Sequence, residues 1–119
     1  MKSRWIDHKG QQIIYGDYAN FNDDVDGLKK EIDSVEVEIV QRPENSVRFL
    51  VDVRETAGIP EITEHLTKAA ISIRKYVLKT GVIGVSGFRK LLVRSIANVS
   101  GMELTLFEDV NEALDWLAE

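Results

Sequence analysis

The chain of 119 residues carries 20 acidic and 15 basic residues, a formal net charge of −5, and no cysteine. Its apolar fraction of 44% is enough to build the core of a single domain. This composition excludes disulfides and cysteine-ligated metal sites, it argues against nucleic-acid binding, and no apolar run approaches the ~18 residues of a membrane-spanning helix.

The first half of the chain predicts three strands and one helix. Residues 4–8 and 12–18 form strands on either side of a turn at Lys9-Gly10. Apolar residues three or four positions apart then predict an amphipathic helix over residues 24–41, which Pro43 terminates. In the strand predicted over residues 47–53, the odd-numbered residues are all apolar and the even-numbered residues are mostly polar. This alternation favours a sheet whose helices pack mainly on one face.

The second half predicts helices that alternate with strands. Pro60 opens a helix expected to extend to about residue 79, and a buried strand over residues 81–85 leads into a helix over residues 88–99. Gly101 is typical of a helix C-terminus. Residues 103–107 form the last strand, and Asp109 resembles the cap of a final helix.

These elements predict an α/β fold with the order ββαβαβαβα in a single domain over residues 1–119. The β/α crossovers require a mostly parallel sheet, here five-stranded with an antiparallel N-terminal edge strand. If successive strands are added in the same direction, the product is a superhelix of β/α units with helices mainly on one face.

The charged residues are distributed unevenly along the chain. Between Leu66 and Met102 there is no acidic residue, and the segment carries +7 against −12 for the rest. The seven basic residues are Lys68, Arg74, Lys75, Lys79, Arg89, Lys90 and Arg94. They form either an ordinary solvated helix face or a surface that meets an anion such as a phosphate, a lipid headgroup or an acidic partner. Complementary surfaces of this kind, together with a half-polar sheet face, also predict a homodimer.

Two positions are candidates for ligand binding. Ser86-Gly87 lies where a strand turns into a helix, so its backbone N–H groups and the helix dipole can hold an anion. The alternative is that Ser86 caps the helix and Gly87 permits close packing. Asp52 lies near the carboxyl end of a strand, where open α/β sheets bind ligands. Its alternative role is structural, either in a pair with Arg54 or as a cap of the following loop. His8 and His65 have no partner at ligand spacing, so no metal site is predicted.

Eight segments, taken in their order and spacing, carry a resemblance to a known family. They are WIDHKG (5–10), IYGDY (14–18), PENSV (43–47), LVDV (50–53), VIGVSGFRKLL (82–92), SG (100–101), FED (107–109) and EALDWL (112–117). With these segments the chain resembles the SpoIIAA-like proteins of the STAS/SEC14 kind. The resemblance implies a small bacterial β/α superhelix without known catalysis, related to anti-sigma factor antagonists and to lipid-carrying SEC14 domains.

The two branches of that family imply different functions. In the antagonist branch a serine after the third strand is phosphorylated by a partner kinase. The corresponding loop here, residues 52–58, contains Thr56 as its only hydroxyl, which argues against a phosphoswitch. The SEC14 branch implies an apolar ligand between the helices and the sheet, with membrane association.

The leading hypothesis is a non-enzymatic binding module for a lipophilic or anionic ligand that can also dock on a membrane surface. The alternative is a regulatory protein–protein interaction domain, and a third hypothesis is a small enzyme that uses Asp52 and Ser86. No cofactor is expected, and the expected location is the cytoplasm, with peripheral attachment to the membrane as a variant. The predicted ligand-binding residues are Asp52, Arg54, Thr56, Ser86 and Gly87, and the seven basic residues form the predicted anionic-surface contact.

Overall fold

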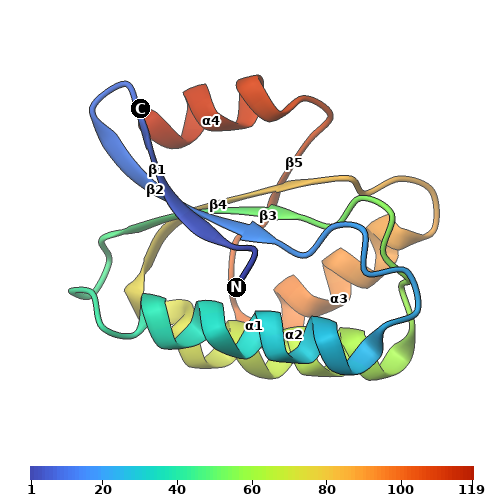
Figure 1. Cartoon of the computed structure of the whole chain (residues 1–119). Coiled ribbons are helices and arrows are strands. Elements are labelled where there is room, and N and C mark those ends of the chain that lie inside the picture. Colours follow the sequence, from blue (N-terminus) through green and yellow to red (C-terminus); the bar gives the residue numbers. More distant parts are fainter.

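The computed structural model describes all 119 residues, Met1–Glu119, and places one five-stranded sheet between helices on its two faces (Figure 1). The strands are β1 (Arg4–His8), β2 (Gln11–Asp17), β3 (Val47–Asp52), β4 (Val77–Ile83) and β5 (Thr105–Phe107). The helices are α1 (Val25–Ile39), α2 (Pro60–Ile73), α3 (Arg89–Ser100) and α4 (Val110–Ala118). None of them is long and apolar enough to cross a membrane.

The sheet has the strand order β1-β2-β3-β4-β5, with β1 antiparallel to β2 and all other neighbours parallel. The predicted fold class and element order are therefore confirmed. The β1–β2 hairpin turns at Lys9 and Gly10, whose φ angles of 50° and 82° both lie in the left-handed region. Two-residue hairpin turns of this kind match the twist of the flanking strands.

Three helices cover one face of the sheet, and the fourth covers the other (Figure 1). Because each parallel strand is added beside the previous one, crossovers of one hand bring α1, α2 and α3 to the same face. The alternation predicted for β3 follows this division. Phe49 and Val51 pack in the cluster beneath α1–α3, whereas Leu50 packs with Ala113 and Leu117 of α4.

The predicted extent of the second helix is wrong. The α2 helix ends at Ile73, a short 3₁₀ turn covers Arg74–Tyr76, and β4 begins at Val77. Val77 is four positions after Ile73, so it fits a helical stripe, but it pairs with Val47 of β3 instead. The β-branched and long apolar residues of this segment suit a pleated strand as well as they suit a helix. Tertiary pairing with β3 decides between the two.

The helix ends show which capping predictions hold. The Asp109 carboxylate accepts a hydrogen bond from the backbone N–H of Glu112 and caps α4, as predicted. Gly101, with φ of 78°, ends α3 in the left-handed conformation, also as predicted. The capping role considered for Ser86 is wrong, because α3 begins three residues later, at Arg89, and no side chain caps it.

Candidate ligand-binding site

An apolar cavity of about 110 Å³ lies between the sheet and helices α1, α2 and α3. Nineteen of the 24 residues that line it are hydrophobic, so its walls give water few hydrogen-bond partners. The sheet contributes Phe49, Val51 and Val82, and the helices contribute residues such as Ile62 and Ile96. The site is therefore shaped to receive an apolar group.

Short side chains on α2 explain why this space is not filled. Ala69 and Ala70 are 9% and 7% exposed, belong to the buried face of α2 and line the cavity. Gly58, in the loop before α2, also lines it, and a Cβ built there would lie 3.0 Å from Leu92 Cδ1. A larger residue at any of these positions would take up part of the cavity.

A second, polar pocket lies at the carboxyl ends of the central strands. It is lined by Asn20, Arg54, Glu55, Gly84, Ser86 and Arg89 and by no hydrophobic residue. The carboxyl ends of parallel strands are the usual location of ligand sites in open α/β sheets. The pocket contains the guanidinium groups of Arg54 and Arg89 and the carboxylate of Glu55, and the charge of Arg54 is balanced by its ion pair with Asp52.

Arg89 lines both the apolar cavity and the polar pocket. Its guanidinium donates to the carbonyl oxygens of Gly84, at 3.1 Å, and Val53, at 3.0 Å, which fixes the side chain across the ends of β3 and β4. A guanidinium has five N–H donors, so others remain for a ligand. One positively charged group thus stands where the apolar and polar spaces meet.

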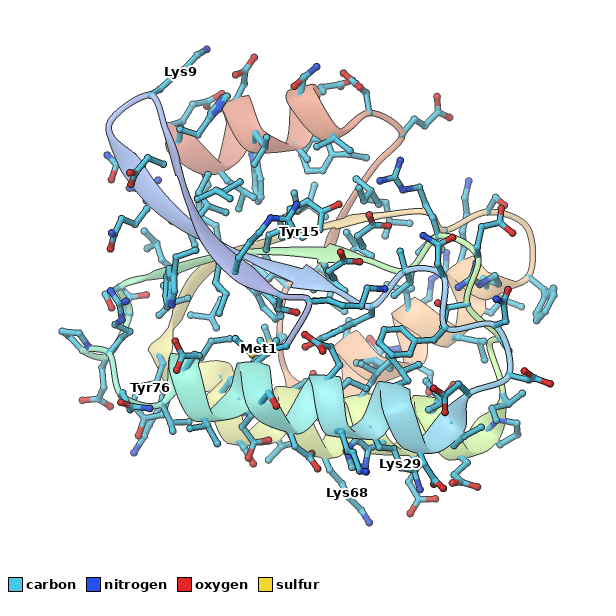
Figure 2. All side chains as sticks on the ribbon, viewed as in Figure 1. Met1, Lys9, Tyr15, Lys29, Lys68 and Tyr76 are labelled. Carbon is cyan, nitrogen blue, oxygen red and sulfur yellow. The ribbon has the colours of Figure 1, made fainter.

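Asp52 is nearly fully buried, at 1% exposure, and lies on the face of the sheet that α4 covers. Arg54 donates to both of its oxygens, with Nη2 to Oδ2 at 2.7 Å, and the Tyr15 hydroxyl donates to Oδ2 at 2.5 Å. Tyr15 is seen on that side of the sheet in Figure 2. The structure therefore contains the pair between Asp52 and Arg54 that was the structural alternative.

The pKa values follow from this geometry. Burial alone would raise the pKa of Asp52, but the hydrogen bonds from Arg54 and Tyr15 outweigh it and hold that pKa below its ordinary value. Burial first, and then the hydrogen bond to Asp52, raise the pKa of Tyr15 to about 12. Asp52 is thus ionised and Tyr15 neutral at neutral pH, and neither is poised to transfer a proton.

The other predicted ligand-binding residues occupy different environments. Thr56 is buried, and its hydroxyl donates to the carbonyl oxygen of Tyr18 at 2.5 Å and accepts from the N–H of Phe21 at 3.3 Å. The Thr56 hydroxyl is thus buried and hydrogen-bonded on both sides. Ser86 and Gly87 are exposed, and Gly87 has φ of 60° in the turn before α3. Ser86 lines the polar pocket, whereas Gly87 does not.

The structure divides the seven predicted basic contact residues among several surfaces. Lys79 lies in β4 and donates to the carbonyl oxygen of Trp116 at 2.6 Å, beneath α4 and away from the other helices. Arg74 donates to the carbonyl oxygen of Ser100 at 3.1 Å at the end of α3. Both side chains are therefore used within the protein.

The remaining basic side chains lie around α2 and α3. Lys68 projects from α2 away from the sheet (Figure 2) and is 3.4 Å from Glu64. Lys75 lies over the ring of Tyr76. Lys90 and Arg94 are exposed on α3 and form no ion pair, so α3 carries an uncompensated positive charge.

No group of histidine, aspartate and glutamate side chains is arranged to hold a metal ion. His8 bonds to Asp115 at 2.7 Å, and His65 bonds to Asp33 at 2.8 Å, both at the surface. Each pair consists of one histidine and one aspartate and links elements far apart in the sequence.

Comparisons of this chain with protein-family models, with curated proteins and with solved structures gave no match. The structure itself defines the class: an α/β domain with a five-stranded mixed sheet and three of its four helices on one face.

An apolar site between the helices and the sheet was expected from the family resemblance alone, and two further features of the site were missed. In the residues themselves the cavity left one signal, the consecutive small residues Ala69 and Ala70 on the inner face of α2. The role of Arg89 between two pockets and the hydrogen bond from Tyr15 to Asp52 left none. Both depend on which strands become neighbours, which the order of residues in one chain does not encode locally.

Proposed function

We propose that this protein is a non-catalytic, SpoIIAA-like binding module for a small amphiphilic ligand. Its apolar part would occupy the cavity between the sheet and α1–α3, and its anionic head would bind at the polar pocket. The observation that carries the proposal is that Arg89 lines both spaces. An apolar site with a few convergent polar groups at one end is typical of ligand pockets.

The volume of the cavity limits the size of the ligand. Sites for drug-sized molecules measure roughly 300–1,000 Å³, whereas an engineered cavity of about 150 Å³ holds one benzene molecule. A cavity of about 110 Å³ therefore suits an apolar group of roughly four to six carbons. This size favours a short acyl chain or a single ring over a complete membrane lipid.

The free energy of an unfilled cavity also supports a ligand. The apolar side chains that line this space lack packing partners on one side, so they forfeit dispersion contacts that a filled core would make. An occupant that restored the missing contacts would recover part of that cost.

The surface around α3 supports the membrane-docking part of the proposal. Phe88, Leu91 and Val99 are 69%, 60% and 64% exposed, beside the exposed basic residues Lys90 and Arg94. Apolar side chains flanked by positive charge favour the interface of an anionic bilayer. The alternative of a phosphorylation-controlled regulatory domain has less support, because the Thr56 hydroxyl is already bonded on two sides.

Calorimetric titration with butyrate, hexanoate and dodecanoate tests the cavity. Two further methylenes contribute ~0.8 kcal/mol each when buried, so hexanoate should bind roughly tenfold more tightly than butyrate. Dodecanoate should gain nothing beyond hexanoate, because its chain exceeds the cavity. Absence of hexanoate binding, or affinity that keeps rising through dodecanoate, would contradict the proposed site.

A matched pair of variants separates the cavity from the rest of the protein. Ala70→Leu places a larger side chain inside the cavity and should abolish hexanoate binding. Ala118→Leu adds the same atoms at a partly exposed position at the end of α4, on the other face of the sheet, and should leave the binding unchanged. Equal affinity in the two variants would show that hexanoate binds elsewhere.

Vesicle sedimentation tests docking on the membrane. The protein should bind phosphatidylcholine vesicles that contain phosphatidylglycerol and should not bind phosphatidylcholine alone. Leu91→Ser should weaken this binding several-fold, whereas Val37→Ser, at a residue 57% exposed on α1, should not. If both variants bind as the unmodified protein does, α3 is not the docking surface.

A further inference from the structure

The wall of the apolar cavity contains one buried hydroxyl without a partner. Thr80 lies in the middle of β4, is 2% exposed and lines the cavity, and its Oγ1 makes no hydrogen bond. A threonine hydroxyl can donate one hydrogen bond and accept two. A buried polar group that is left unsatisfied is rare in folded proteins and requires an explanation.

The other threonines of the same wall do not share this property. The Thr56 hydroxyl donates to the carbonyl oxygen of Tyr18, and the Thr63 hydroxyl donates to the carbonyl oxygen of Ile59 at 3.2 Å. Each therefore finds a backbone acceptor near its own position. Thr80 has no such acceptor, although its Cα lies opposite Phe49 in a regular parallel pair of strands. The lack of a hydrogen-bond partner is thus specific to Thr80 and is not shared by the other threonines that line the cavity.

Rotation about χ1 exchanges the hydroxyl and the methyl group of a threonine between staggered positions. Because Thr80 lines the cavity, such a rotation can turn Oγ1 toward a molecule that occupies it. We propose that Thr80 is a specificity-determining residue, and that the occupant carries an oxygen or nitrogen atom within its apolar part. The ligand class is then a small ring or short chain with one internal hydrogen-bonding group, not a plain hydrocarbon.

This inference rests on the proposed function, since it needs the cavity to be a binding site. Phenol and toluene are suitable probes, because they have nearly the same size and shape and only phenol forms strong hydrogen bonds. Binding of each is measured by calorimetry with the unmodified protein, with Thr80→Val and, as the matched control, with Thr67→Val on α2, a threonine that does not line the cavity. Valine has the shape of threonine without the hydroxyl.

The preference for phenol is the ratio of its affinity to that of toluene. This ratio should be about three- to tenfold higher in the unmodified protein than in Thr80→Val, as one net hydrogen bond predicts. Thr67→Val should keep this preference, and so should Thr80→Ser, which retains the hydroxyl. Without ligand, Thr80→Val should also unfold at a higher temperature, by a few degrees, because it removes an unsatisfied buried group.

Three results would overturn the proposal, and they are distinguishable. If both probes bind with the same preference in the unmodified protein and in Thr80→Val, the role of Thr80 is wrong and the cavity remains a binding site. If neither probe nor hexanoate binds, the proposed function fails together with this inference. A lower unfolding temperature for Thr80→Val would show that the hydroxyl already has a structural partner, and would also overturn it.

Discussion

The two faces of the sheet are built from similar apolar residues but differ in how completely they are filled. Beneath α4, Leu50, Ile83, Ala113 and Leu117 are each at most 1% exposed, and the buried carboxylate of Asp52 has its hydrogen bonds satisfied. Beneath α1–α3 there is a cavity of about 110 Å³, and one threonine hydroxyl is unsatisfied.

This difference assigns different roles to the two faces. A tightly packed face with a satisfied polar network stabilises the fold and fixes the strand register. An unfilled space and an unpaired hydroxyl make the other face less stable than it could be. Such local losses of stability are typical of binding sites. The ends of β3 and β4, where Arg54 and Arg89 lie, connect the two faces.

The largest expected effect comes from breaking the polar network on the α4 face. Asp52→Asn should lower the free energy of unfolding at pH 7 by roughly 2–3 kcal/mol, less than for a fully buried ion pair because the Arg54 side chain is 54% exposed. Urea denaturation measures the change. Asp23→Asn, at an exposed carboxylate, is the control and should change stability by less than about 0.5 kcal/mol.

The contribution of the Asp52 carboxylate to the free energy of unfolding should depend on pH. Because the pKa of Asp52 is lowered in the folded protein, its contribution is fully present above the unfolded value of about 4. The contribution is lost as the pH falls through the lower, folded pKa. The difference in unfolding free energy between the unmodified protein and Asp52→Asn should therefore be constant from pH 5 to 7 and shrink below about pH 4. A difference that grows on acidification would contradict this assignment.

The next largest effect is expected from an alanine-to-leucine substitution, which should act in opposite directions on the two faces of the sheet. Ala113→Leu, at a position 0% exposed beneath α4, should overpack the core and destabilise the protein by about 1–3 kcal/mol. Ala70→Leu fills part of the cavity and should stabilise the protein by about 0.5–2 kcal/mol. Thermal unfolding of both variants tests the contrast. Equal destabilisation would mean that the two faces are packed alike.

The smallest effects are expected at the helix N-termini. Asp109→Ala removes the cap of α4 and should cost about 1 kcal/mol. Ser86→Ala removes a hydroxyl that caps nothing and should change stability by less than about 0.5 kcal/mol. Chemical denaturation resolves the two values. A loss near 1 kcal/mol for Ser86→Ala would show that this serine caps α3 in solution.

The element order and the sheet were predictable because their signals are local. The alternation in β3, the turn at Lys9-Gly10 and the cap at Asp109 each reflect a few neighbouring residues. The boundary at Val77 was not predictable, since its pattern fits a helix and a strand equally well and pairing with β3 decides. The pair between Asp52 and Arg54 was anticipated as an alternative, because the two residues are only two positions apart at the end of β3.

The cavity and its polar atoms could not be predicted in the same way. They result from residues of several elements that meet only after the strands are ordered. The acid-free segment, residues 67–101, shows that closeness in sequence does not predict closeness in space. Its seven basic residues are close in sequence, yet Lys79 and Arg74 are bound to backbone carbonyls at separate places, whereas Lys90 and Arg94 are exposed on α3.

A crystal structure of the protein grown with hexanoate tests the central claim most directly. The account predicts electron density for the alkyl chain between β4 and helices α2 and α3, with the carboxylate next to the Arg89 guanidinium. An empty cavity at saturating hexanoate, or hexanoate bound only at the protein surface, would contradict the claim that this face of the sheet is a binding site.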